Sequence, residues 1–379
     1  ATHRNDRYKA WGFNALGEYT STRGLPVGTW GSSSGNSVQL PFILLLNAAL
    51  DALQNPGSIG LTEAVKDIIA AVPIATYNDF RGPLVDLWDP KYVQAMDAEV
   101  DYWGIGARPG GPGLPAITGG FANKPWVIGI TPDDGDKLFG FKSHGTAPVV
   151  AYLHPAFMVA CTNHTYAGFV DQQLYTKTAW IDFLTTRYGT VGNLNNVWNT
   201  SGFYTTFGAT TFGTGTGVKD EDGRHTAWMG TDAKTLAGAN VNLVIDLNDF
   251  LYEMGKKWAT VSRTSIRVHD TNHLIFGPAA LNNYGAKART KLLQGMADGG
   301  VDVFQLNYDP TYGPNAGSMT ENNQSYDEMK KPAFIWFSVT AQADEWREAD
   351  TYREATFLTL LVIDYGQTSY IAKHPELYK

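Results

Sequence analysis

Three acids that follow a predicted strand are the first residues in this sequence that could do chemistry. The apolar run at 126–131 is typical of a strand, and it leads into the sequence TPDDGD. Asp133, Asp134 and Asp136 have three possible uses: they could form a turn or helix cap, supply a catalytic acid or base, or bind a metal ion. The residue types alone leave all three open.

Short apolar runs and longer helical patterns alternate along the chain. This alternation is typical of repeated β-α units built around a parallel sheet. Several of the apolar runs end in polar or aromatic residues, which would place those residues at one edge of the sheet. The predicted strands cover residues 12–19, 41–46, 126–131, 273–278, 301–308 and 333–339.

The clearest predicted helix covers 246–267, where apolar residues recur at three- and four-residue steps and form one stripe. Trp258 in this helix and Trp180 in another are predicted to lie in the core. Residues 186–245 are rich in Gly, Thr and aromatic residues, and we predict a rim insertion or lid within a single domain, 1–379. Further helices are predicted at 89–103, 176–189, 287–300 and 349–366.

Several stretches of the chain share local patterns with one known family. They are WGFNALGEYTS at 11–21, VDLWDPKYVQAM at 85–96, AWIDFLTTRYGTVGNLNNVWNTS at 179–201, VDVFQLNYDP at 301–310 and KPAFIWFSV at 331–339. They resemble the (β/α)₈-barrel glycoside hydrolases of clan A, especially the agarase-like and β-galactosidase-like branches. The resemblance implies a TIM barrel with its site at the C-terminal ends of the strands, where an oligosaccharide or polysaccharide would bind.

The resemblance also implies two catalytic carboxylates, on the fourth and seventh strands of the barrel. The family's fourth strand ends in Asn-Glu, and Asp133 and Asp134 stand in those places, so Asp134 is the expected acid/base. On the seventh strand Trp336 stands where the nucleophilic glutamate is expected. Because tryptophan cannot act as a nucleophile, Glu345 or Asp344 would have to return to the site from the loop that follows.

Aromatic side chains are the expected sugar contacts, because their rings stack on sugar faces as well as filling cores. Trp336 and Tyr308 lie near the ends of predicted strands and could form such a platform, and Trp30 is a further candidate. Asn307, beside Tyr308, could hydrogen-bond a sugar hydroxyl.

Two other polar residues have a structural and a functional interpretation. Glu221 lies in the acidic run KDEDGRH, which could be a structural loop, an active-site lid or a cation site, although the full spacing of an EF-hand is absent. His154 could be a satisfied structural histidine or contact a substrate hydroxyl. No histidine spacing indicates zinc, and we expect neither a metal nor a cofactor.

Charge and cysteine content exclude several function classes. The net charge is -8 and no basic cluster occurs, so nucleic acid is not an expected partner. The single cysteine, Cys161, allows no intrachain disulfide and is predicted to be a buried small hydrophobe. It fits either a reducing compartment or bacterial export, and an extracellular or periplasmic location is the expectation. No apolar stretch is long enough for a membrane span, so we expect a soluble protein.

The ends of the predicted barrel are incomplete. Nothing before 12–19 predicts a first strand, and 366–372 is only a thin candidate for the eighth, so the chain could be part of a longer one. An open barrel would expose sheet edges, which favours association with further copies.

The leading hypothesis is a glycoside hydrolase that uses carboxylate acid/base chemistry. The alternatives are a catalytically degenerate barrel that binds carbohydrate or self-assembles, and an α/β enzyme of other chemistry.

Overall fold

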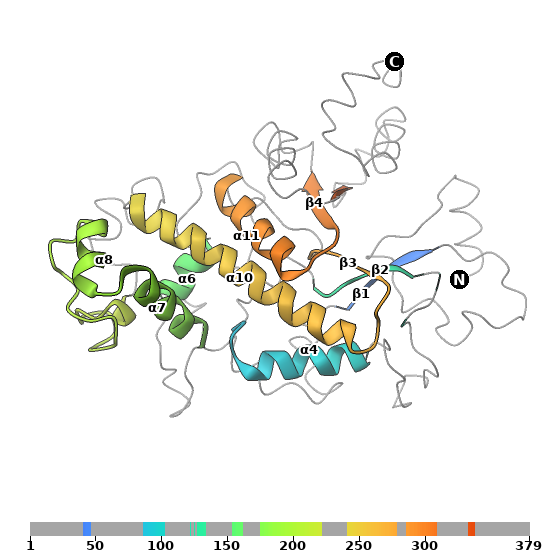
Figure 1. Ribbon diagram of the computed structural model, residues 1–379, viewed down its shortest axis with the longest axis horizontal. Helices are drawn as coiled ribbons and strands as arrows, with labels where there is room; N and C mark the ends of the chain where they lie inside the picture. Colours follow the sequence, from blue (N-terminus) through green and yellow to red (C-terminus); the bar gives the residue numbers. More distant parts are fainter. Residues whose placement is uncertain are drawn as a thin grey trace, which may run out of the picture.

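The computed structural model describes residues 41–46, 86–102, 122, 125, 127–133, 154–161, 175–221, 241–278, 286–308 and 333–337. Strands and helices alternate along this part of the chain (Figure 1). They are β1 Phe42–Leu45, α4 Pro90–Tyr102, β2 Val127–Thr131, α6 Pro155–Cys161, α7 Tyr175–Tyr188, α8 Val191–Trp198, the 3₁₀ turn Val218–Asp220, α10 Val241–Arg267, β3 Leu274–Ile275, α11 Ala286–Gly299, β4 Phe304–Tyr308 and β5 Ala333–Phe337.

All the described strand pairs are parallel. β2 lies between β1 and β3, and β4 pairs with β5. A parallel bridge between Phe276 and Val303 joins the two sheets, and the Gly277 N–H donates to the Val303 carbonyl at 2.8 Å. The strands therefore follow one another in the order β1-β2-β3-β4-β5. The expected mixed α/β organisation with a parallel sheet is confirmed, whereas closure of a complete barrel stays a prediction.

Gly129 lets β2 and β3 pack closely. A Cβ at this position would lie 2.6 Å from the Leu274 carbonyl oxygen and would overlap the ring of Phe276. Any larger residue would therefore push the ring away or separate the strands. The β2 sequence VIGIT combines β-branched residues, which favour a strand, with the one small residue that this contact requires.

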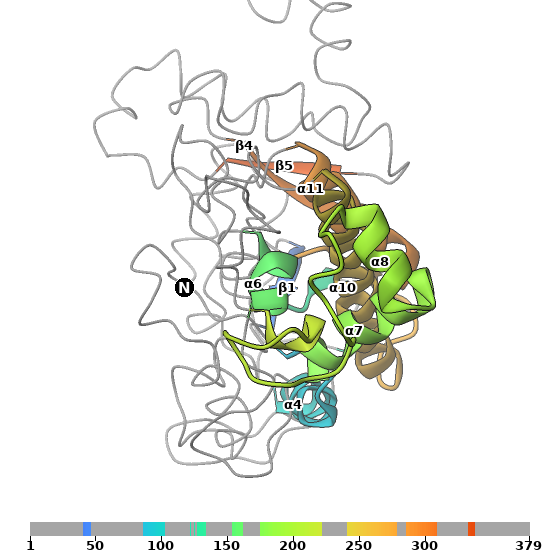
Figure 2. The same cartoon turned by 90° about the vertical axis from the view of Figure 1, so that its left-hand side faces the viewer.

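The long helix α10 is the centre of the helical layer. Leu247, Phe250, Met254 and Trp258 are buried on one side of it, as the apolar stripe predicts. The helix runs past α4, α7 and α11 (Figure 1), and the view turned by 90° again shows α7 and α11 beside it (Figure 2). Trp180 on α7 is also fully buried, so the prediction that Trp180 and Trp258 belong to the core is confirmed.

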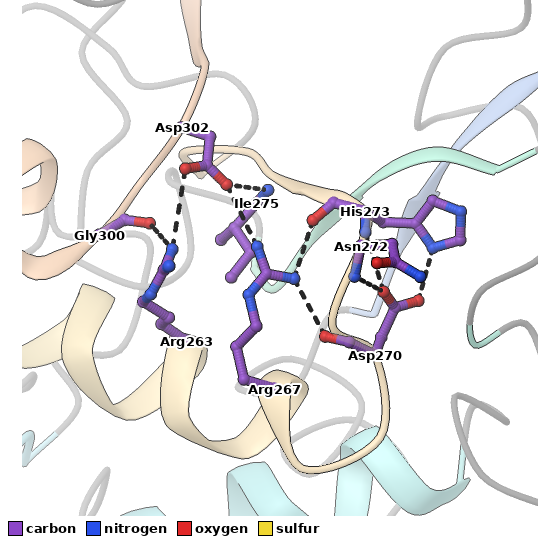
Figure 3. A network of polar contacts seen from close by, with 8 residues as sticks. All are labelled: Arg263, Arg267, Asp270, Asn272, His273, Ile275, Gly300 and Asp302. Atoms are coloured by element: carbon purple, nitrogen blue, oxygen red, sulfur yellow. Dashed lines mark hydrogen bonds and ion pairs between the residues drawn. The ribbon is translucent and has the colours of Figure 1, made fainter.

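A network of arginines and aspartates holds the N-terminal ends of β3 and β4 together (Figure 3). Asp302, just before β4, accepts a hydrogen bond from the Ile275 N–H at 2.9 Å. Arg267 approaches the same carboxylate at 3.4 Å, and Arg263 donates to the Gly300 carbonyl at 2.9 Å. The end of α10 is thereby joined to both strands.

Asp270 and His273 form a second part of this network, in the turn from α10 to β3 (Figure 3). The buried Asp270 carboxylate accepts the His273 backbone N–H at 2.9 Å and lies 2.5 Å from its ring Nδ1. Arg267 donates to the carbonyl oxygens of both residues, at 3.0 and 2.9 Å. These contacts lie at the edge of the sheet opposite to the C-terminal strand ends, so their role there is structural.

Most of the predicted elements are found where the structure describes the chain. Predicted strands at 41–46, 126–131, 273–278, 301–308 and 333–339 contain β1 to β5. The predicted strand 12–19 and helix 349–366 lie outside the described residues. None of the helices in the described part of the chain has both the length and the apolar character needed to cross a bilayer.

Two helices, α6 and α8, were not predicted. α8 lies inside the stretch 186–245, so the described part of that stretch is more regular than expected. Thr190 caps its start by accepting the Asn193 N–H at 3.2 Å, and Asn199 ends it in the left-handed conformation with φ of 52°. These two caps compensate for a helix sequence that contains a glycine and several asparagines. That the stretch 186–245 forms a rim insertion or lid stays a prediction.

Candidate active site

The C-terminal end of β2 carries the best-defined polar side chain of the candidate site. Asp133 lies two residues after β2 and is fully buried. Its Oδ2 accepts a hydrogen bond of 3.1 Å from the indole Nε1 of Trp258, in the second half of α10. A buried carboxylate needs such donors, because an unpaired one would lose its hydration without compensation. The backbone immediately before Asp134 is therefore anchored to the helical layer.

Two buried hydroxyl-bearing residues continue the cluster that begins at Asp133. Tyr92 on α4 lies close to the Asp133 carboxylate, and Ser262 on α10 lies close to Tyr92. Burial, together with the negative charge of Asp133, raises the pKa of Tyr92 well above its usual value of 10. Tyr92 is therefore a neutral phenol at every physiological pH. α4, α10 and the end of β2 meet in this polar cluster.

β4 and β5 bring together three of the predicted sugar contacts. The register pairs Asn307 with Trp336 and Tyr308 with Phe337, at the C-terminal ends of the two strands. The backbones of Asn307, Tyr308 and Trp336 are thus neighbours across the paired strands, although Asn307 and Trp336 lie 29 positions apart in the sequence. Because all the described strands are parallel, this corner lies at the same edge of the sheet as the end of β2.

His154 lies at the start of α6 and is buried. The Phe157 N–H donates to its Nδ1 at 3.4 Å, which leaves the proton on Nε2, 3.0 Å from Asn248 Oδ1. Burial lowers the pKa of His154 from 6.5 to about 4, although the bond to Asn248 opposes that shift. The ring is therefore neutral at physiological pH, and both of its nitrogens have protein partners.

Glu221 is also buried, at the end of the 3₁₀ turn. Its Oε2 accepts a hydrogen bond of 2.6 Å from the Tyr204 hydroxyl. The neighbouring Asp220 links two parts of the same loop. Its carboxylate accepts hydrogen bonds from both the N–H and the hydroxyl of Thr210 at 2.5 Å. Although burial raises the pKa of Asp220, bonds from Thr210 and from backbone N–H groups lower it overall. In the described part of the chain, both acids thus hold the loop in shape.

Lys177 on α7 is a buried cation that sequence reasoning did not single out. Its ammonium donates to the Ala160 carbonyl and to the Glu221 carbonyl, the latter at 3.3 Å. Burial lowers the pKa of Lys177 from 10.5 to about 8, and the nearby Cys161 and Glu221 limit that decrease. Cys161 is buried, as predicted. The lysine joins α7, α6 and the loop that ends in Glu221.

Several predicted site residues lie outside the described residues, namely Asp134, Asp136, Asp344, Glu345 and Trp30. The sequence predicts that Trp258 lies in the core, but it does not predict the hydrogen bond from Trp258 to Asp133. The only available signal was the indole N–H itself, since a buried tryptophan usually finds an acceptor. Among the described residues no three His, Cys, Asp or Glu side chains gather closely enough to hold a metal ion.

Comparison with known proteins adds a likeness of fold. No protein-family model and no curated protein matches this chain. The crystal structure of an agarase, AgWH50C, superposes with a TM-score of 0.51 and 18% sequence identity over 88% of this chain. An exo-β-agarase and a protein called PfGH50B match with TM-scores of 0.47 and 0.48, both at 16% identity, over 87% and 88% of this chain.

The fold resembles that of an agarase. This chain spans 36% of the length of AgWH50C, 33% of the exo-β-agarase and 36% of PfGH50B. At this identity the likeness concerns the arrangement of strands and helices, not the residues that do chemistry. The sequence resemblance named agarase-like and β-galactosidase-like branches, and the likeness of fold agrees with the first of them.

Proposed function

We propose that this chain is part of a glycoside hydrolase that acts on an oligosaccharide or polysaccharide, with Asp134 as the general acid/base. The observation that carries the proposal is the anchored end of β2. Asp133 is bonded to Trp258 at 3.1 Å, and the next residue in the chain is Asp134. General acid catalysis depends on exact placement of the proton donor, so a rigid strand end is a suitable support for it.

The second carboxylate of the proposed mechanism is Glu345 or Asp344. Both follow β5 in the chain, by seven or eight residues after Phe337. One carboxylic acid would protonate the leaving glycosidic oxygen, and the other would act on the opposite side of the sugar ring. A separation of about 5 Å between the carboxyls would give retention of configuration, and about 6.5 to 9.5 Å would give inversion.

Asn307, Tyr308 and Trp336 are the proposed sugar contacts, because β4 and β5 bring these positions together at the same edge of the sheet. Glu221 and His154 are left out of these contacts, since both are buried with protein partners. The likeness of fold to an agarase makes agarose the first polymer to test. Secretion and self-association stay predictions alongside this function.

A catalytically degenerate barrel that binds carbohydrate is the second candidate. The observation that favours it is the presence of Trp336 on β5. The family that the sequence resembles has its nucleophilic glutamate at this place. Tryptophan cannot replace a carboxylate in the mechanism, but it can stack on a sugar ring. The two candidates therefore differ in turnover and agree in binding.

The experiment compares hydrolysis and binding of agarose and of glucose- and xylose-based polysaccharides. Wild type, Asp134→Asn and the control Asp97→Asn, which removes an exposed carboxylate from α4, are measured in parallel. We expect Asp134→Asn to abolish turnover of one polymer while binding is kept, and Asp97→Asn to be unchanged. Binding without turnover by the wild type would reject the hydrolase in favour of the degenerate barrel. Sedimentation of the same samples measures self-association.

A further inference from the structure

A groove lined by aromatic rings lies between α7, α10 and the segment that precedes α4. It encloses about 580 Å³. Trp88, Tyr175, Phe183 and Phe250 line it, and we refer to it as the aromatic groove. The three segments lie side by side at the place where α7 and the start of α4 approach α10 (Figure 1).

Three of the four rings of the aromatic groove contact one another. Trp88 lies almost flat on Phe250, with ring centroids 5.6 Å apart and an angle of 14° between the planes. Phe183 contacts the same Phe250 ring at 5.6 Å, and Tyr175 is 40% exposed. Asp86 ties the Trp88 segment to α7 by accepting the Tyr175 and Thr176 N–H groups at 2.9 and 2.8 Å. The groove is thus formed before any ligand arrives.

Polar groups accompany these rings. Asp182, Glu253 and Thr186 line the groove, and Asp182 and Thr186 are exposed. Arg187 lines it too, but its guanidinium already pairs with Asp246 at 3.0 Å and Asp249 at 2.7 Å. The positive charge is therefore compensated within the protein, whereas Asp182 and Glu253 can accept hydrogen bonds from a ligand.

This combination selects the chemistry of the ligand. An anionic ligand would be repelled by the two carboxylates and by a net charge of -8. A purely apolar ligand would leave Asp182 and Glu253 without hydrogen bonds at its edge. A sugar has an apolar C–H face for the rings and a rim of hydroxyl donors for the carboxylates, and so it satisfies both parts of the groove.

We propose that the aromatic groove is a second binding site for a neutral oligosaccharide, separate from the strand-end site. The proposal rests on the proposed function for the class of ligand, but its residues are different. The described lining residues come from α7, α10 and the Trp88 segment, and none lies on a strand or directly after one. Such a site would hold a polymer chain on the protein while the strand-end site acts on it.

The test uses variants that change the groove without removing core side chains. Thr186→Trp fills the groove from an exposed position of α7, and Asp182→Asn removes an exposed carboxylate. The matched control is Asp97→Asn, on the exposed side of α4. Binding of a hexasaccharide of agarose and of a glucose hexasaccharide is measured at 4 °C by calorimetry, in the wild-type and Asp134→Asn backgrounds. Thermal unfolding confirms that each variant is folded.

We expect Thr186→Trp and Asp182→Asn to raise the Kd of one hexasaccharide roughly tenfold, in both backgrounds, while Asp97→Asn leaves it unchanged. The same groove effect together with no turnover by the wild type would support the second site and reject the hydrolase. Turnover of the hexasaccharide with no difference between the groove variants and the control would reject the second site and keep the hydrolase. The site is also rejected if no hexasaccharide binds, or if tetramethylammonium binds there instead.

Discussion

Trp258 and Asp133 lie 125 positions apart in the sequence and are joined by a hydrogen bond of 3.1 Å from the indole Nε1 to the carboxylate Oδ2. Both residues are fully buried. The bond connects α10 to the segment after β2, at the last described residue before Asp134. The long helix therefore determines where the proposed catalytic loop begins.

Replacing Trp258 by phenylalanine should cost more stability than the same change at Trp180. Both tryptophans are fully buried, but Trp180 Nε1 has no hydrogen-bond partner in the described part of the protein, whereas Trp258 Nε1 bonds Asp133. Loss of a donor to a buried carboxylate costs about 1 to 3 kcal/mol, so Trp258→Phe should be the less stable variant by about that amount. Urea denaturation measures the difference, and equal losses would show that the bond contributes nothing.

The stability of the protein should fall between pH 6.5 and pH 4, in part because of His154. The folded-state pKa of about 4 lies below the unfolded value of 6.5, so the unfolded state binds the proton more readily in this window. The stability contribution is complete above pH 6.5 and is lost as the pH falls toward 4. The shift corresponds to about 3 kcal/mol.

The check for His154 is a series of urea denaturations at pH values from 7 to 4. We expect His154→Gln to show a weaker pH dependence than the wild type, even if the variant is less stable at pH 7. Identical slopes for His154→Gln and the wild type would mean that the pKa of His154 is the same in the folded and the unfolded protein.

The sequence predicts the elements of this fold better than the contacts between them. The stripe on α10 and the apolar runs of β1 to β5 follow from periodicity and residue type, and the structure has them. α8 was missed because its caps, Thr190 and Asn199, are local signals within a stretch of low helix propensity. Asp133 has the same residue type as Asp134 and Asp136, so only the tertiary contact with Trp258 distinguishes it.

Buried Lys177 predicts a pH effect of the same sign on the alkaline side. Its folded-state pKa of about 8 lies below the unfolded value of 10.5, so the unfolded state binds the proton more readily between these values. This contribution to stability grows as the pH rises through that window. Relative to Lys177→Met, the wild type should gain roughly 2 kcal/mol between pH 7.5 and 9.5. Urea denaturation at both pH values tests this, and a constant difference between the two proteins would show that Lys177 titrates normally.

Two glycines should respond in opposite ways to alanine, because only one of them has a neighbour in the way. Gly295 on α11 faces α10 so closely that a Cβ would overlap the Tyr252 carbonyl and lie 2.9 Å from the Lys256 nitrogen. Gly295→Ala must separate the two helices and should cost about 2 to 4 kcal/mol. Gly192 is exposed on α8, where a Cβ would meet only Thr190 Oγ1 at 3.8 Å.

Gly192→Ala should therefore stabilise the protein by about 0.5 to 1 kcal/mol, since alanine loses less conformational freedom in a helix. Thermal and urea unfolding of both variants measure the contrast. A neutral Gly295→Ala would mean that α10 and α11 can move apart without loss, and the close contact would then not hold the helical layer together. If Gly192→Ala is destabilised instead, position 192 of α8 has a backbone conformation that alanine cannot adopt.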